Sequence, residues 1–385
     1  MLNSIVKWGL TMSKTQLYAL DNLVREIKVT SSEYHANGHP RLRAIKFLIS
    51  WFCLMAILAG CTSGGAGTAG SNEAEANGSA SDKGKSRQVI RIGYQKGNTL
   101  NVLKVNGNLE KRLKADGYDV EWKVFAGGNF LLEALSSGSI DFGHAADGSG
   151  VFAQAGNKPF VYVGNDLPNP EGIGIVVHPE SGIKSIADLK GKKLAVAKGG
   201  NHHYLAVLAI ERAGLKLVDI QFVYVKDASE GRAVFETKQV DALGSWDPFF
   251  AAVQTDLKPL TLTDGQGYSP NRTFYYANEH FAKEKPELIR TILEEIQVSD
   301  EWANSHKDEV IRLLSETQGI DKEAIELAVK RRTYGVELFN STIIDAQQHL
   351  ADTYYRIGLI PSPIKVAERM PLDTPWAAKG PITSM

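Results

Sequence analysis

The chain has 385 residues, of which 43% are hydrophobic and 9% aromatic, so it can fill the cores of two domains of ordinary size. Its 43 Lys and Arg residues balance 44 Asp and Glu residues, and a formal net charge of -1 argues against a nucleic acid partner. The only cysteines, Cys53 and Cys61, lie in the first sixth of the chain. The remainder can therefore form neither a disulfide nor a thiolate metal cluster.

The first 60 residues are expected to direct the chain out of the cytoplasm. Residues 47–60 (FLISWFCLMAILAG) form an apolar run behind three basic residues, with the length of a secretory signal core rather than of a membrane span. The run ends in LAGC, which resembles the lipobox of bacterial lipoproteins and predicts cleavage before Cys61 and lipidation of its sulfur. An uncleaved helix or signal anchor is the alternative. Residues 1–40 are longer than an ordinary signal n-region, and we assign them no function.

A polar linker separates this segment from the globular body. Residues 61–87 consist almost entirely of Gly, Ser, Ala, Thr and scattered charged residues after the cysteine. Such a composition cannot bury enough apolar surface to fold, so we expect a flexible tether.

The globular body alternates strand-like and helix-like segments twice over. In the first half, strands are predicted at residues 89–94, 118–125, 140–145 and 159–165, separated by helical patterns. The second half repeats the alternation with a capped helix at 183–189, strands at 193–197, 220–225 and 240–246, and helices at 198–214 and 229–239. Residues after about 268 are predicted to be mostly helical. This order predicts an α/β protein with two parallel-type sheets flanked by helices, whose ligands lie at the carboxyl ends of the strands.

Several segments of the body resemble a known family. They are IRIGYQKGN, LLEALSSGSIDFG, FAQAGNKPFVYVGN, SIADLKGKKLAVAKGGNHHYL and VDALGSWDPFFAAV. Together they resemble the aliphatic sulfonate-binding proteins of bacterial ABC importers, within the wider nitrate, sulfonate and taurine binding family. The likeness runs from about residue 91 to residue 358 and is densest up to residue 255.

The resemblance implies a type II periplasmic-binding-protein fold with two lobes and a two-segment hinge. We place the crossings near Pro168–Gly172 and Asp264–Arg272. The expected boundaries follow from these crossings: the first lobe comprises residues 88–168 and 272–360, the second lobe residues 169–271, and a C-terminal tail residues 361–385.

The stretch KGGNHHYL (198–205) is the most informative candidate for the binding site. A glycine turn between a strand and a helix exposes backbone N–H groups at the positive end of the helix dipole, which suits an anion. An ordinary tight turn is the alternative. The resemblance adds that this loop faces the acidic head of the ligand, with Gly200, Asn201 and His203 contributing and His202 at a variable position.

Neither metal binding nor catalysis is expected at the two histidines. Adjacent residues of a helix point about 100° apart, so His202 and His203 cannot readily chelate one ion, and no HExxH spacing is present. The sequence also lacks a GxSxG motif, a P-loop and any cysteine after residue 61. We therefore expect no metal, no cofactor and no enzymatic activity.

Further binding residues are predicted where other strands end, because these ends meet at one crevice. Amides and hydroxyls there can donate hydrogen bonds to sulfonate oxygens, and a tryptophan can form an apolar wall for an alkyl chain. The candidates are Gln95, Asn98, Gly128, Asn129, Asp147, Ser149, Trp246 and Asp247. For Trp246 a role in the core, and for Asp247 a role as a helix cap, are the alternatives.

One loop departs from the family pattern. Sulfonate-binding relatives tend to carry prolines where this chain has AADGSG (145–150). Asp147 in that loop would repel an anion unless it is neutralised or binds a ligand ammonium, which keeps taurine open as a ligand.

These observations predict a monomeric extracytoplasmic lipoprotein that delivers an alkanesulfonate to an ABC permease. Taurine, nitrate, bicarbonate and a thiamine pyrimidine precursor remain alternative ligands on the same fold. The lipobox and the cysteine-free body argue against a biosynthetic enzyme on this scaffold, and a sensor input domain is not expected because no transmembrane or kinase segment follows the body in the given sequence.

Overall fold

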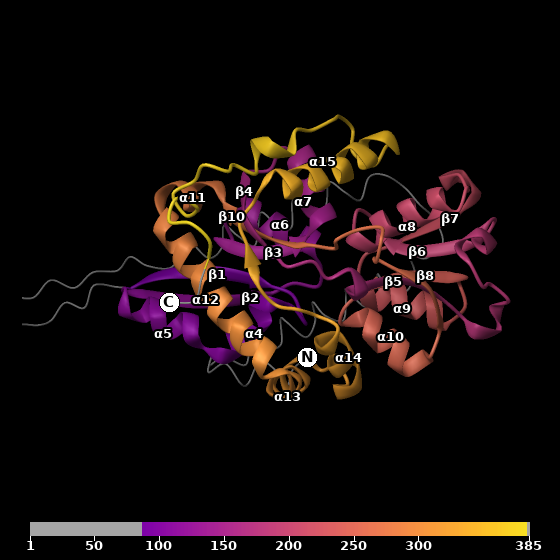
Figure 1. Ribbon diagram of the computed structural model, residues 1–385, viewed down its shortest axis with the longest axis horizontal. Coiled ribbons are helices and arrows are strands. Elements are labelled where there is room, and N and C mark those ends of the chain that lie inside the picture. Colours follow the sequence, from indigo (N-terminus) through magenta and orange to yellow (C-terminus); the bar gives the residue numbers. More distant parts are fainter. Residues whose placement is uncertain (1–86, 383–385) are drawn as a thin grey trace, which may run out of the picture. The chain divides into compact units, whose positions relative to one another are not determined.

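A computed structural model describes residues 87–382, which belong to one compact unit, residues 83–385. The predicted export segment, Cys61 and nearly all of the tether lie outside the described residues. Within the described part of the chain, no helix combines the length and the apolar character that crossing a membrane requires. Two sheets with flanking helices make up this part (Figure 1).

The first sheet has six strands in the order β11-β4-β10-β3-β1-β2. The strands β1, β2 and β3 pair in parallel, whereas β10 runs antiparallel between β3 and β4. Their bounds are Gln88–Tyr94 (β1), Tyr118–Val124 (β2), Phe142–Ala146 (β3), Phe160–Asp166 (β4), Thr273–Asn278 (β10) and Val336–Glu337 (β11).

The second sheet has five strands in the order β7-β6-β8-β5-β9. Here β6 pairs in parallel with β7 and β8, and β5 runs antiparallel between β8 and β9. Their bounds are Ile173–Val177 (β5), Lys193–Ala197 (β6), Gln221–Val225 (β7), Ala242–Trp246 (β8) and Leu260–Asp264 (β9). In each sheet the first strand after the chain has crossed from the other sheet, β10 or β5, runs antiparallel to both of its neighbours, and in the first sheet the short edge strand β11 also pairs antiparallel with β4.

Helices cover both faces of each sheet, which confirms the predicted fold class. Their bounds are Thr99–Asn106 (α4), Asn108–Ala115 (α5), Gly128–Ser136 (α6), Asp147–Ala155 (α7), Asn201–Arg212 (α8), Ala228–Glu236 (α9), Phe249–Leu257 (α10), Glu279–Glu284 (α11), Pro286–Ser305 (α12), Lys307–Gln318 (α13), Lys322–Lys330 (α14) and Ser341–Arg356 (α15). We call the first sheet with α4–α7 and α11–α15 the first lobe, and the second sheet with α8–α10 the second lobe.

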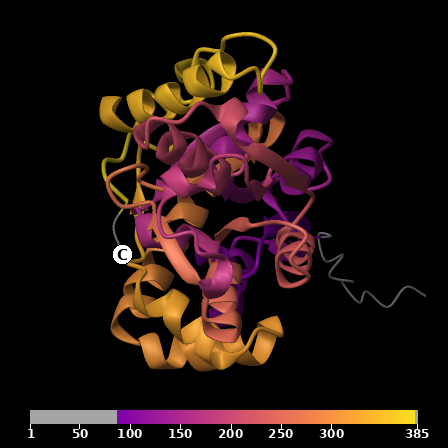
Figure 2. The same cartoon turned by 90° about the vertical axis from the view of Figure 1, so that its right-hand side faces the viewer.

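The cores follow from the apolar faces of these helices. In the first lobe, α4, α5 and α12 pack on one face of the sheet, while α6, α7 and α15 pack on the other. In the second lobe, α8 covers one face, and α9 and α10 cover the other. Figures 1 and 2 show α15 (yellow) and the pair α13 and α14 (orange) on opposite sides of the molecule.

The chain crosses between the lobes twice, between β4 and β5 and between β9 and β10. The first connection contains Pro168–Gly172, and the second follows Asp264, the last residue of β9. One predicted helix is shorter than expected, because residues 183–189 form only the 3-10 turn Ile186–Leu189. Its predicted cap is present, since Asp188 accepts hydrogen bonds from the backbone N–H and the hydroxyl of Ser185.

Candidate functional site

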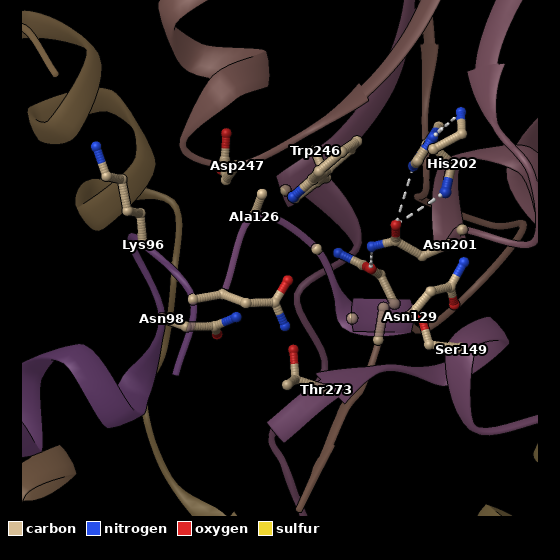
Figure 3. Close-up of a pocket in the computed structure, with 18 of the residues that line it drawn as sticks. Lys96, Asn98, Ala126, Asn129, Ser149, Asn201, His202, Trp246, Asp247 and Thr273 are labelled. Atoms are coloured by element: carbon tan, nitrogen blue, oxygen red, sulfur yellow. Dashed lines mark hydrogen bonds between the residues drawn. The ribbon is translucent and has the colours of Figure 1, made fainter. Parts of the chain in front are cut away.

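A cavity of about 80 Å³ lies where the carboxyl ends of strands from both sheets meet (Figure 3). We call it the inner chamber. Segments after β1, β2, β3, β6, β7 and β8 line it, and both crossings contribute residues. Its lining includes Gln95, Lys96, Asn98, Gly127, Gly128, Asn129, Ser149, Asn169, Lys198, Gly200, Asn201, His202, Lys226, Trp246, Asp247, Asn271, Thr273 and Arg332.

Four helices begin at the inner chamber without a side-chain cap. The helices α4, α6, α7 and α8 have Asn98, Gly127, Ala146 and Gly200 at their N-caps, and none of these side chains accepts a hydrogen bond from the first turn. By contrast, Asp227 caps α9 by accepting a hydrogen bond from the N–H of Glu230. In α7 and α8 one first-turn N–H donates to the side chain of the first helical residue, Asp147 or Asn201. The positive ends of the four helix dipoles and the other N–H groups of the first turns still favour an anion in the chamber.

Glycines allow two of these helix starts to approach across the lobes. A Cβ atom on Gly148, in α7, would lie 2.2 Å from the carbonyl oxygen of Gly199, just before α8. Gly199 itself has a φ of +76°, in the left-handed region that favours glycine. Tyr354 of α15 lies at the same contact between α7 and α8 and donates a 3.1 Å hydrogen bond to the carbonyl oxygen of Gly200.

Three buried asparagines connect the second lobe to both crossings. Asn201 donates a 2.6 Å hydrogen bond from Nδ2 to Oδ1 of Asn271, and Asn271 donates to the carbonyl oxygen of Asn169. All three side chains line the inner chamber. Amide N–H groups that remain directed at the chamber can bind an anion without adding a charge of their own.

The two adjacent histidines have different surroundings, although both are buried. His202 lines the chamber: its Nε2 accepts from the N–H of Ala197, so its Nδ1 carries the proton and donates to Oδ1 of Asn201. His203 lies on the other side of the helix, where Nδ1 accepts from the N–H of Gly199. Burial lowers the pKa of His202 to about 3 and that of His203 to about 4, so both imidazoles are neutral near pH 7.

Trp246 forms one wall of the inner chamber. Its ring stacks on His202 with ring centroids 4.7 Å apart, and it meets Phe249 edge to face at 5.6 Å. The tryptophan is therefore held by an imidazole on one side and by a phenyl ring on the other, which fixes an apolar surface against the chamber.

The one acidic side chain found in the chamber lining of the described residues is paired. Asp247 accepts two hydrogen bonds from the guanidinium of Arg331, one of them a 2.7 Å bond from Nε to Oδ2. Asp247 also accepts from the N–H of Ala251, in the first turn of α10. Burial raises the pKa of Asp247, while Arg331 opposes that shift by favouring the charged form.

Arg332 brings a positive charge to the chamber from the first lobe. Its Nη2 donates to Oδ2 of Asp166, which also accepts a 3.0 Å hydrogen bond from Thr99. The hydroxyl of Tyr275 donates to the other oxygen of Asp166. Asp300 is fully buried nearby, and burial together with the charge of Asp166 raises its pKa well above the usual range. This buried network fixes the guanidinium in place.

Asp147 lies at a different cavity. Its side chain lines a space of about 130 Å³ together with Tyr204, Arg272 and Gln347, on the other side of the start of α7. Its Oδ1 accepts a 2.7 Å hydrogen bond from the N–H of Gly148. Burial raises the pKa of Asp147 to about 7, although that hydrogen bond opposes the shift.

Comparisons with known proteins identify relatives of this chain. The family model described as "NMT1/THI5 like" matches residues 113–310. The "Putative aliphatic sulfonates-binding protein" of Escherichia coli (strain K12) is 35% identical over 287 residues, which cover 74% of this chain and 89% of that relative.

Two solved structures have folds similar to that of this chain. The periplasmic aliphatic sulphonate binding protein SsuA from Escherichia coli has a TM-score of 0.69 at 34% identity, covering 74% of this chain and 92% of that chain. The alkanesulfonate-binding protein SsuA from Xanthomonas axonopodis pv. citri, bound to MOPS, has a TM-score of 0.70 at 31% identity and covers 74% and 98%. The chain belongs to the aliphatic sulfonate-binding protein family. As a member of this family, it is a solute-binding protein.

The structure of this family member brings together nine of the eleven binding residues predicted from the sequence. These nine are Gln95, Asn98, Gly128, Asn129, Ser149, Gly200, Asn201, Trp246 and Asp247. The other two, Asp147 and His203, do not line the inner chamber. Neighbouring helical positions point in different directions, so His202 takes the place expected for His203, and the carboxyl group of Asp147 turns to the second cavity.

Sequence reasoning missed several polar residues of the chamber, among them Asn169, Asn271, Thr273, Lys226 and Arg332. Both asparagines lie in the crossings, whose positions were predicted, and this could have marked them as candidates. Arg332 lies two residues after the end of α14, far along the chain from the other binding residues, and nothing in its local pattern points to the site. Among residues 87–382, no group of three or more His, Cys, Asp or Glu side chains could hold a metal ion.

Proposed function

We propose that this protein is a lipid-anchored receptor that captures a small aliphatic sulfonate between its two lobes and delivers it to an ABC permease. The anchor would be the lipidated sulfur of Cys61, at the end of the LAGC motif. No bond of the ligand is made or broken, and the ligand dissociates unchanged when the lobes separate. The receptor would act as a monomer.

The observation that carries the proposal is the set of donors around the inner chamber. Four uncapped helix starts, the amides of Asn129 and Asn201 and the guanidinium of Arg332 converge there, so oxygens of a sulfonate could each meet several donors. Hydrogen bonds to a charged group typically contribute about 1.5–3 kcal/mol each. Trp246 offers the apolar surface that the carbon next to the sulfur needs.

The ligand would also keep the lobes together. Its oxygens would contact α6 and α7 of the first lobe and α8 of the second lobe at the same time. Because these contacts form together only when the lobes are close, binding would shift the hinge equilibrium toward the closed state. A permease could then distinguish loaded from empty receptor by its shape.

The arrangement of carboxylates favours a simple anion over a zwitterion such as taurine. Asp147, which could have attracted a ligand ammonium, faces the other cavity, and Asp247 is paired with Arg331. A ligand ammonium in the inner chamber would therefore lack an unpaired carboxylate among the described residues.

Thermal unfolding of the full chain in the presence of candidate ligands tests this proposal. Ligand at about 100 times its Kd should raise the melting temperature by about 5 °C, since it adds about 2.7 kcal/mol to the folded state. We expect butanesulfonate to produce this rise, with smaller effects from taurine, sulfate, nitrate, bicarbonate and a thiamine pyrimidine precursor. A rise with one of the latter and none with any alkanesulfonate would overturn the ligand assignment.

The lipid anchor has its own test. Cells that express the protein are given radiolabelled palmitate, and the purified wild type is compared with a Cys61→Ser variant. Label on the wild type alone supports the anchor, and equal label on both, or none on the wild type, contradicts it.

A further inference from the structure

The cavity that Asp147 lines lies at the second crossing, and we call it the hinge cavity. Its volume is about 130 Å³. Its lining comes from the crossing itself (Tyr268, Ser269, Pro270 and Arg272), from α15 of the first lobe and from Tyr204 of α8 in the second lobe. Among the described residues, none that lines the hinge cavity also lines the inner chamber. A molecule in one cavity therefore leaves the other one free.

The hinge cavity has a buried floor and an exposed mouth. The buried residues of its lining include Asp147, Tyr204, Phe274 and Gln347. The exposed residues of its lining are Pro270, Ala346 and His349. A small molecule can therefore enter from solvent between α15 and the second crossing and reach the buried groups.

The carboxyl group of Asp147 meets this cavity with one oxygen unpaired. The residue is only 4% exposed, and its Oδ1 accepts a hydrogen bond from the N–H of Gly148. No group among residues 87–382 donates a hydrogen bond to its Oδ2. Buried carboxylates in proteins are normally paired with a cation or with several donors. An unpaired one at a cavity that opens to solvent indicates a function that folding alone does not require.

The groups around Asp147 leave its charge uncompensated. Arg272 is the one cationic side chain of the described lining, and its guanidinium already donates to the carboxylate of Glu337 and to the carbonyl oxygen of Asp166. His349 lies at the exposed mouth. Burial raises the pKa of each phenol near the carboxyl group, so four neutral side chains surround it: Tyr162, Tyr204, Tyr276 and Tyr354.

Aromatic rings supply the rest of the chemistry in the hinge cavity. Tyr204, Tyr268 and Phe274 line it, and the guanidinium of Arg212 lies 3.9 Å from the ring centroid of Tyr268. Aromatic rings beside a carboxylate favour an organic ammonium ion. A metal ion would need several oxygen or nitrogen ligands, and Asp147 is the only carboxyl group of the described lining. The volume suits a small organic molecule, because a cavity of about 150 Å³ can hold benzene.

We propose that the hinge cavity is a second binding site of this protein and that it takes a small primary alkylammonium ion. The ammonium group donates a hydrogen bond to Oδ2 of Asp147, and the alkyl carbons lie against Tyr204 and Phe274. Since the lining combines both lobes and the second crossing, the bound ion contacts all three parts of the molecule.

Thermal unfolding of the full chain at pH 8 in the presence of propylammonium chloride tests the site. An ion with so few non-hydrogen atoms should bind with a Kd on the order of 1 mM. At about 100 times this concentration it should raise the melting temperature by about 5 °C over KCl of the same concentration. The positive charge is required, so neutral 1-propanol should raise the melting temperature by less than about 1 °C.

A variant and a change of pH connect this rise to Asp147. Asp147→Asn keeps the shape of the side chain and removes its charge, so the rise should fall below about 1 °C. Asp345→Asn is the matched control, because Asp345 is an exposed carboxylate of α15 that does not line the cavity, and it should keep the full rise. The pKa of Asp147 is about 7, whereas an alkylammonium stays charged like lysine, so the rise in the wild type should also disappear at pH 5.

Three results would overturn the second site: no rise in the wild type at pH 8, the same rise in Asp147→Asn, or the same rise with 1-propanol. Ala346→Phe keeps the test decisive if Asp147→Asn does not fold. It places a ring at the exposed mouth, so the rise should shrink at least threefold, and an unchanged rise would contradict the site. These measurements contain no sulfonate, so their outcome leaves the proposed function unaffected.

Discussion

The first lobe brings a buried guanidinium to the inner chamber, whereas the second lobe brings neutral rings and amides beside the ion-paired Asp247 and the exposed Lys198 and Lys226. On the first-lobe side, Arg332 is held by Asp166 inside a network that includes Thr99 and Tyr275. On the second-lobe side, a neutral His202 supports Asn201 and stacks on Trp246. The difference indicates that the fixed guanidinium of the first lobe attracts an anion, whereas the neutral side chains of the second lobe determine the shape of the chamber.

The largest effect is expected from removing the cation of the first lobe. Arg332→Met would leave Asp166 buried without its partner, and breaking a buried pair in this way typically costs about 3–5 kcal/mol. Urea unfolding at pH 7 measures the loss. The control is Arg112→Met, which removes an exposed ion pair with Asp116 and should cost less than about 1 kcal/mol. Similar losses in the two variants would show that the buried network does not stabilise the lobe.

Asp147 is a buried carboxyl group that should oppose folding at neutral and higher pH. Its pKa is about 7 in the folded protein and about 3.8 as its ordinary value, so the folded state favours the protonated form. The free energy of unfolding is therefore highest below about pH 4 and decreases by a few kcal/mol as the pH rises through 7. Asp147→Asn should therefore raise the melting temperature at pH 8 and leave it nearly unchanged at pH 4.

A control for Asp147→Asn comes from an acidic residue with the opposite shift. Hydrogen bonds from the backbone of Lys184 and from Ser185 lower the pKa of Asp188, so Asp188→Asn should lose stability at pH 8. If Asp147→Asn also loses stability at pH 8, the carboxylate of Asp147 has a role in the folded protein that its surroundings do not explain.

The neutral histidines of the second lobe predict a loss of stability in acid. The pKa of His202 is lowered to about 3, below its ordinary value of 6.5, so the unfolded state binds a proton that the folded state does not. The free energy of unfolding is highest above about pH 6.5. It falls by about 1.4 kcal/mol per pH unit for each such histidine as the pH drops toward 3.

Replacing His202 tests this dependence. His202→Gln should unfold more readily than the wild type at pH 7 and show a smaller slope of stability between pH 6 and pH 4.5. His280→Gln, whose ring is exposed, provides the control. An unchanged slope in His202→Gln would mean that the buried imidazole is protonated in the folded protein.

The smallest expected effect concerns one hydroxyl at the head-group end. Ser149 is buried at the start of α7 and lines the inner chamber. Ser149→Ala should weaken binding of butanesulfonate about tenfold, which equals about 1.4 kcal/mol, and change the free energy of unfolding by less than about 0.5 kcal/mol. Ser137→Ala, at an exposed serine after α6, is the control in the same calorimetric titration. Equal affinities of Ser149→Ala and the wild type would remove this hydroxyl from the site.

The fold and most of the chamber could be predicted because both depend on local patterns. Alternating strands and helices determine where strands end, and the ends of β1, β3, β6 and β8 carry Gln95, Ser149, Gly200 and Trp246 to one place. What remained unpredicted depends on orientation and on distant packing. The choice between His202 and His203 requires the rotation of α8, and Arg332 reaches the chamber through contacts of α14 that no local pattern encodes.

A crystal structure of the protein with hexanesulfonate tests the central claim most directly. The account predicts the sulfonate group between the starts of α6, α7 and α8, with Asn201 in hydrogen-bonding distance, and the first alkyl carbons against Trp246. A sulfonate group bound outside the inner chamber, or a ligand that contacts only one lobe, would contradict it.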